Sequence, residues 1–226
     1  DAAPIVAPAK LADDARRLLR DVEDCDLDAN RRHFLTAQVR GLRTTAQKLA
    51  GEPISYSDEV ETSYGVRPQQ VPEDVFAEAH ARLDATLPGS GPLAERLIAW
   101  RETQVVPREK LRAAVSSLAE DLRERTRTMF GLPDGEHVEF DLVTNQPWSG
   151  FNYFLGDLQS RVAINTDLPV LSNTLAHLVA HESYPGHHTE HSRKEVGLVR
   201  RRKQLEETIF LVGTPQCLIA EGLADL

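Results

Sequence analysis

The chain contains one stretch that decides how the rest is interpreted, and it reads His177-Leu-Val-Ala-His181-Glu182-Ser-Tyr184-Pro185-Gly186-His187-His188-Thr-Glu190-His191. Five of the eight histidines of the protein fall within it, together with two carboxylates. The apolar run that precedes the motif, from Leu171 to Ala180, predicts a buried helix. Surface histidines at a helix end would explain a single histidine but not this density. We therefore interpret the stretch as a helix that carries a metal site.

The spacing of these residues is close to a zinc hydrolase motif. In His-Glu-x-x-His, two imidazoles on one helix face hold the ion, and the glutamate acts as general base on a water molecule. Here the position of the second histidine is occupied by Pro185, and the next histidines are His187 and His188. The motif is therefore His-Glu-x-x-Pro-Gly-His-His, and the identity of the second ligand is open.

Three pairings are compatible with this spacing. The proline removes a helix hydrogen bond and the glycine relieves the backbone, so a bulge or break would bring His187 towards His181. A kinked but continuous helix would instead return His188 to the face of His181, because seven residues are close to two turns. His177 and His181 are four residues apart and share a face without distortion. We slightly favour His187.

The motif resembles the bacterial domain of unknown function 885 family, which is regarded as zincin-like. Three further segments carry the resemblance: Asn145-Gln-Pro-Trp-Ser-Gly-Phe-Asn-Tyr153, Arg161-Val-Ala-Ile-Asn-Thr-Asp-Leu-Pro169 and Ala220-Glu221-Gly222-Leu-Ala-Asp225. It is strong over residues 136–226 and loose before them. The resemblance implies a zincin-like fold of the gluzincin type, in which a glutamate is the third metal ligand, and it places Glu221 in that role. It implies no substrate.

Hydrophobic periodicity predicts an α+β, mainly helical fold, with a helical region over residues 1–131 and a region with a small sheet over residues 132–226. The resemblance implies that this second region is zincin-like and catalytic. After a lead-in over residues 1–10, we expect helices at 11–22, 27–50, 75–87, 93–106 and 107–130, with a loop over residues 52–70. Strands are expected near 138–143, 151–155 and 161–165, forming a small sheet packed on the histidine helix. A charged helix over 189–208 and a last helix from residue 216 follow. We expect the catalytic region to continue beyond Leu226.

Composition excludes several classes of protein. The net charge of −9 argues against a nucleic-acid partner, which usually requires a basic face. Cys25 and Cys217 match no metal or redox spacing. No apolar run approaches the length of a membrane span, and the sequence leaves the localisation open.

These observations predict a Zn²⁺-dependent hydrolase, with a peptidase as the preferred activity. His181 would bind zinc together with His187 or His188, and Glu221 would be the third ligand, with Glu190 or Asp225 as alternatives. Glu182 would be the general base. The residues expected to contact substrate or stabilise the oxyanion are Tyr184, Asn152 and Tyr153. The substrate would be a peptide or a small amide, held beside the helix as an added strand.

Two other functions are compatible with the same residues. One is a catalytically silent zinc or peptide-binding domain, in which four protein ligands such as His181, His187, His188 and Glu221 would close the metal site. The other is a metal hydrolase of non-peptide amides or esters. An open ligand position beside Glu182 would favour an enzyme over the silent domain.

Overall fold

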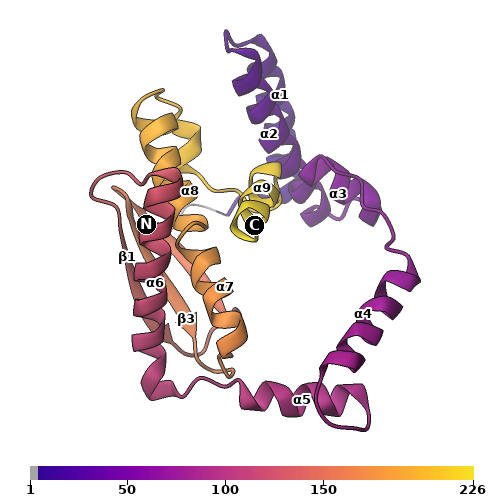
Figure 1. Cartoon of the computed structure of the whole chain (residues 1–226). Helices are drawn as coiled ribbons and strands as arrows, with labels where there is room; N and C mark the ends of the chain where they lie inside the picture. The colour runs from indigo at the N-terminus through magenta and orange to yellow at the C-terminus, as the bar shows by residue number, and fades with distance from the viewer. Residues whose placement is uncertain (1–4) are drawn as a thin grey trace. The chain divides into compact units, whose positions relative to one another are not determined.

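The computed structural model describes residues 5–226 and is mainly helical with one small mixed sheet (Figure 1). The expected α+β, mainly helical class is confirmed. The chain forms two compact units, one of Asp1–Gln70 with Ile209–Gly222 and the other of Val71–Thr208 with Leu223–Leu226. The division that we expect at residue 131, between a helical region and a zincin-like catalytic region, stays a prediction. None of the helices in the described residues is long and apolar enough to cross a membrane.

The first unit consists of α1 (Pro8–Asp24), α2 (Ala29–Leu49), α3 (Tyr56–Tyr64) and most of α9 (Pro215–Ala224). The start of the expected lead-in, residues 1–4, lies outside the described residues, and the lead-in prediction is wrong from Pro8 onward, where the chain is helical. The loop predicted for residues 52–70 is also wrong, because it contains α3. Ser55 caps this helix by accepting a 3.2 Å hydrogen bond from the amide of Asp58.

In the second unit, α4 (Glu73–Thr86), α5 (Leu93–Thr103) and α6 (Arg108–Phe130) each begin directly after a proline. Proline is suited to a helix start because its missing amide is not needed there. After α7 (Ser172–Glu182) and α8 (His187–Lys194), a π-helical turn covers Glu195–Arg200 and a 3₁₀ turn covers Leu205–Thr208. The single charged helix predicted over residues 189–208 is therefore wrong. Glu195 instead accepts a hydrogen bond from the Leu158 amide, which ties this turn to the sheet.

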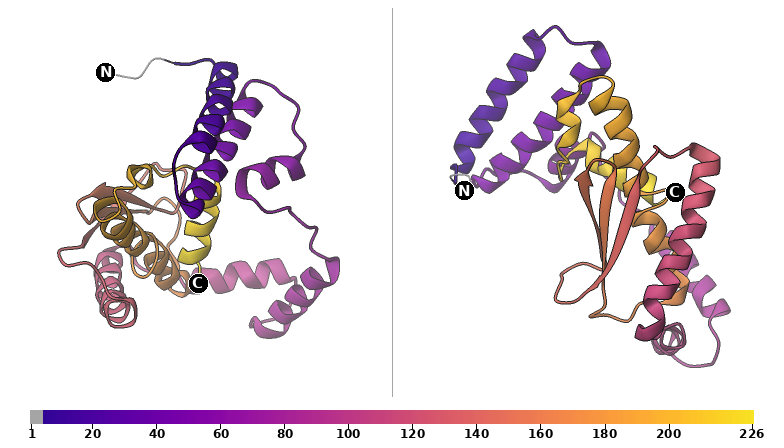
Figure 2. Two further views of the ribbon diagram at one scale, coloured as in Figure 1. Left: turned by 90° about the horizontal axis from the view of Figure 1, so that it is seen from above. Right: turned by 90° about the vertical axis from the view of Figure 1, so that its left-hand side faces the viewer.

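The sheet has the order β1-β3-β2, with β1 (His137–Val143) parallel and β2 (Gly150–Gly156) antiparallel to β3 (Gln159–Asn165). The β2–β3 hairpin turns at Asp157 and Leu158, both of which have positive φ. Figure 2 shows α6 and α7 on one face of the sheet. The register explains this packing, because Phe140 lies opposite Val162 and Leu142 opposite Ile164, so one face of β1 and β3 is apolar. The core between the layers contains Leu111, Val115, Ala119, Val138, Val162, Ile164, Leu175, Val179 and Tyr184.

Candidate metal centre

The histidine stretch folds as two helices separated by a four-residue break. α7 ends at Glu182 and α8 begins at His187. The amide of Gly186 donates to the carbonyl of Ala180 at 3.0 Å, so the chain folds back closely on the end of α7. A Cβ atom at Gly186 would lie 1.9 Å from the carbonyl oxygen of His181. The glycine of the motif is therefore required for this close backbone approach.

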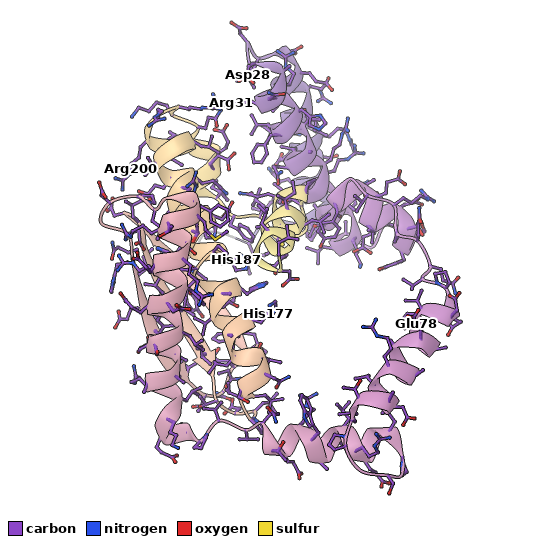
Figure 3. All side chains as sticks on the ribbon, viewed as in Figure 1. Asp28, Arg31, Glu78, His177, His187 and Arg200 are labelled. Carbon is purple, nitrogen blue, oxygen red and sulfur yellow. The ribbon has the colours of Figure 1, made fainter. Side chains whose placement is uncertain are left out.

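The break brings His187 against His181. Their ring centroids are 4.6 Å apart with an interplanar angle of 84°. His187 opens α8 and is buried, and its position and that of His177 can be followed in Figure 3. Of the pairings that the spacing left open, the structure adopts the one with a broken helix. His177 also lies near His181, with ring centroids 5.9 Å apart.

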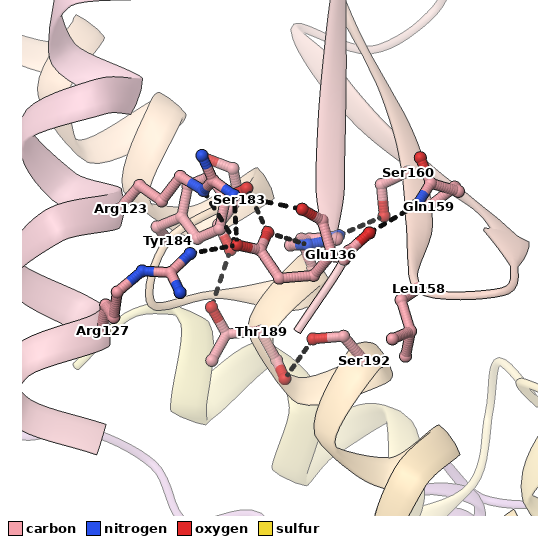
Figure 4. Close-up of polar contacts among 12 residues, drawn as sticks. Arg123, Arg127, Glu136, Leu158, Gln159, Ser160, Ser183, Tyr184, Thr189 and Ser192 are labelled. Carbon is pink, nitrogen blue, oxygen red and sulfur yellow. Dashed lines mark hydrogen bonds and ion pairs between the residues drawn. The ribbon is translucent and has the colours of Figure 1, made fainter. Parts of the chain in front are cut away.

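His188 contacts other residues of the second unit, namely Glu136 and Ser160, which are labelled in Figure 4. It is fully buried, with Nε2 3.0 Å from Oε2 of Glu136 and Nδ1 2.8 Å from Oγ of Ser160. Because a carboxylate only accepts, Nε2 carries the proton and donates to Glu136. Both ring nitrogens are then engaged by other side chains, so His188 has a structural role in this arrangement.

Glu136 is the centre of this buried network. It accepts hydrogen bonds from Arg123 at 2.8 Å, Arg127 at 3.1 Å and the hydroxyl of Tyr184 at 2.6 Å. Burial opposes the charged form of Glu136, but the hydrogen bonds from His188, Tyr184 and Arg123 outweigh it and lower the pKa of Glu136 to about 2. Glu136 could not be selected from sequence, because a single acidic residue before a strand forms no motif of recognisable spacing.

Tyr184 is part of the same network instead of lining an open site. Its ring packs on His188 at 5.2 Å between centroids, and its side chain is in the hydrophobic core. Burial and the hydrogen bond to Glu136 raise the pKa of its phenol. The substrate contact that we expect of Tyr184 stays a prediction, and its hydroxyl is already occupied by Glu136.

Glu182 lies at the end of α7 and against the first residue of β2. Its side chain is only 7% exposed, and a Cβ atom at Gly150 would lie 3.2 Å from its Oε1. Asn152 donates from Nδ2 to the backbone carbonyl of Glu182 at 2.7 Å. The buried Oδ1 of Asn152 has no hydrogen-bond partner among the described residues. Asn152 therefore joins β2 to the end of α7 and retains one acceptor there.

Tyr153 lies on the other face of β2, because neighbouring strand residues alternate. The guanidinium of Arg161 lies 4.7 Å from the centre of its ring, and Phe151 packs beside it at 4.7 Å between centroids. The two residues that we expect to bind substrate from this strand are therefore on opposite faces. Only Asn152 contacts the motif helix.

Asp225 adds a carboxylate to the histidines of α7. Its Oδ1 lies 2.9 Å from Nδ1 of His181 and 3.5 Å from Nε2 of His177. One ligand atom from each of the three residues lies within 4.8 Å of the others. Glu190, an alternative third ligand, is held by Lys194 at 3.3 Å, and burial raises its pKa. Glu221 belongs to the first unit, and its role as a ligand stays a prediction.

The donors present fit a zinc ion. Neutral imidazole and carboxylate are ordinary zinc ligands, and ligand atoms around one tetrahedral ion lie about 3.5 Å apart. One ring nitrogen of His181 and one of His187 lie within 4.8 Å of each other, so both could bind the same ion. His191, the last histidine of the stretch, stacks on Phe154, and burial lowers its pKa to about 3.

Comparison with known proteins gives information about the fold of the chain. No family model and no curated protein matches the sequence. The chain is similar to a solved structure described as "the putative lipoprotein from Colwellia psychrerythraea", with a TM-score of 0.52 and 16% sequence identity. The match covers 93% of this chain and 43% of the other, so the chain spans less than half the length of that neighbour. Similarity at this identity supports the fold alone.

Proposed function

We propose that the protein is a zinc-dependent hydrolase with a zincin-like catalytic region, and that peptides are its substrates. The observation that carries the proposal is the contact between the rings of His181 and His187 across the helix break. Glu182 follows the first of these histidines directly and is buried against an edge of the sheet. A pair of imidazoles with an adjacent carboxylate is the arrangement by which zinc hydrolases act.

His181, His187 and Glu221 are the proposed ligands. The carboxylate of Asp225 lies 2.9 Å from Nδ1 of His181 and orients that ring, and in the proposed site Nε2 would be the donor to an ion. Asp225 then orients a ligand instead of binding the metal. The resemblance described above supports the assignment of this glutamate.

The chain's own residues account for proton transfer and substrate position. A bound zinc would supply a Lewis acid that polarises a carbonyl and makes water easier to deprotonate. Glu182 takes the proton of the attacking water and delivers it to the leaving amine. Asn152 holds the backbone of Glu182 in place. Within the described residues β2 is hydrogen-bonded to β3 alone, so its outer edge has backbone groups to which an extended peptide can add.

The orientation of His188 favours an enzyme over a silent zinc domain. A closed four-ligand site that used both His187 and His188 would need His188 to leave Glu136 and Ser160, where both of its nitrogens are engaged. The exposed edge of β2 favours peptides over small esters or amides, because only an extended chain can use its backbone groups.

Elemental mass spectrometry of the purified protein tests the proposal, together with hydrolysis of a mixed peptide library. We expect about one zinc per chain in the unaltered protein and in Glu182→Gln, and loss of zinc in His181→Ala and Glu221→Ala. Glu182→Gln should retain the metal and lose hydrolysis. His80→Ala, which alters an exposed histidine of α4, is the matched control. Zinc that persists in His181→Ala would overturn the proposed site.

A further inference from the structure

The second unit contains a cavity of about 790 Å³ beside the proposed catalytic helix. Its walls are formed by α5, by the segment that leads from β3 into α7, and by the first turns of α7. The apolar residues that line it are Leu97, Ile98, Trp100, Val105, Leu168, Pro169, Val170, Leu171 and Leu178. A cavity of this size falls within the range of about 300–1,000 Å³ that is typical of ligand sites.

The chemistry of the lining selects an uncharged apolar group. Ile98 is 59% exposed and Leu168 is 73% exposed, so large apolar side chains face solvent at this place. The charged residues of the lining, Arg101 and Glu102, offset one another. A charged ligand would therefore gain no net attraction, whereas an apolar one would remove these side chains from water.

The cavity and the proposed catalytic site share helix α7. His177 and Leu178 line it, and Leu178 precedes Glu182 by one turn of α7, a rise of about 6 Å. Ser149, also in the lining, directly precedes Gly150, whose Cα faces the Glu182 carboxylate. An extended peptide advances about 3.3 Å per residue. A residue about two positions from a bond placed at Glu182 would therefore reach the cavity.

We infer that this cavity is a specificity subsite, and that it receives a large apolar side chain of the peptide within about two residues of the scissile bond. The inference rests on the proposed function, because it takes the scissile bond to be a peptide bond cleaved beside Glu182. It assigns the substrate class as peptides with residues such as leucine or phenylalanine at that position. Peptides with glycine or an acidic residue there are poor substrates.

The two tryptophans of the chain allow a binding test that does not depend on catalysis. In a Trp148→Phe protein, Trp100 in the cavity wall is the single tryptophan and reports on its occupation. Titration with N-acetyl-leucine amide should change its emission in a saturable way, and N-acetyl-aspartate amide or N-acetyl-glycine amide should bind at least about fivefold more weakly. Leu168→Asp in the same background should weaken binding of the leucine derivative at least about tenfold. Met129→Asp, which introduces the same charge at an exposed position of α6, is the matched control.

Quenched peptides that differ only at one position near the bond complete the test. We expect leucine and phenylalanine peptides to be cleaved at least about tenfold faster than glycine peptides, and Leu168→Asp to remove that preference. No saturable Trp100 response, or one unaffected by Leu168→Asp, would overturn the subsite whatever the cleavage results. If ligands still bind beside Trp100 but no zinc-dependent cleavage is observed, the proposed hydrolase function is contradicted. The assignment of the substrate class is then contradicted as well.

Discussion

The Cα of Gly186 lies so close to the carbonyl oxygen of His181 that an added Cβ atom would stand 1.9 Å from it. A second backbone atom, the carbonyl oxygen of Ala180, would lie 2.5 Å away. Backbone atoms within a helix cannot move aside as the end of a side chain can. The position of His187 against His181 therefore depends on the absence of a side chain at residue 186.

We predict that Gly186→Ala lowers the free energy of unfolding by about 3 kcal/mol, because the new methyl group forces the end of α7 to shift. The zinc content should fall at the same time, since His187 would move away from His181. Denaturant unfolding and elemental mass spectrometry measure the two effects. Gly197→Ala is the control, because nothing lies within 4 Å of a Cβ at that position. Equal stability of the two variants would contradict the described break.

A milder effect is expected at Gly150 in β2. A Cβ there would lie 2.8 Å from Cδ1 of Leu178 and 3.2 Å from Oε1 of Glu182. Both are side-chain atoms that can turn away, so Gly150→Ala should cost only about 1 kcal/mol of stability. The displaced carboxylate should nevertheless lower peptide hydrolysis by about 100-fold, with zinc retained. Unchanged hydrolysis would show that Glu182 does not act from its position against β2.

Much of the fold could be predicted from sequence because its signals are local. The alternation of Val138, Phe140 and Leu142 predicts a strand, and the prolines before α4, α5 and α6 mark helix starts. α3 was missed because its acidic residues look like an exposed loop, although Ser55 and Asp58 together are a helix start. The break in the predicted helix over residues 189–208 depends on a contact between Glu195 and the distant β2–β3 turn, which local patterns do not show.

The position of the candidate site in the chain could be predicted from sequence, but the residues that form it could not all be identified. The density of histidines identifies the stretch, yet the spacing alone cannot choose between His187 and His188. The contact between His188 and Glu136, which lies 52 residues earlier in the chain, bears on that choice and is not visible in the local spacing. The carboxylate of Asp225 beside His181 is equally a long-range contact, across 44 residues. Long-range partners of this kind have no signature within a single segment.

The Glu136 network predicts a loss of stability in acid. The pKa of Glu136 is lowered in the folded protein, from its ordinary value of 4.5 to about 2, so its charged form is stabilised by folding. The resulting contribution, about 3 kcal/mol, is present above pH 4.5 and is lost as the pH falls towards 2. Unfolding curves of the unaltered protein and Glu136→Gln should converge over this range. Glu139→Gln, at an exposed position of β1, should leave the pH dependence unchanged.

Replacement of His187 and replacement of His188 should have different effects on the protein. His187→Ala should weaken zinc binding by more than about 100-fold, because it removes a ligand and not merely a residue that supports one. His188→Ala should instead lower the free energy of unfolding by about 3 kcal/mol, because it leaves the buried Glu136 without one of its donors and the Ser160 hydroxyl without its partner. Measuring zinc affinity by chelator competition and stability by urea unfolding on both variants separates the effects. Loss of zinc in a folded His188→Ala protein, with zinc retained in His187→Ala, would reverse the assignment and show that the helix rearranges when the metal binds.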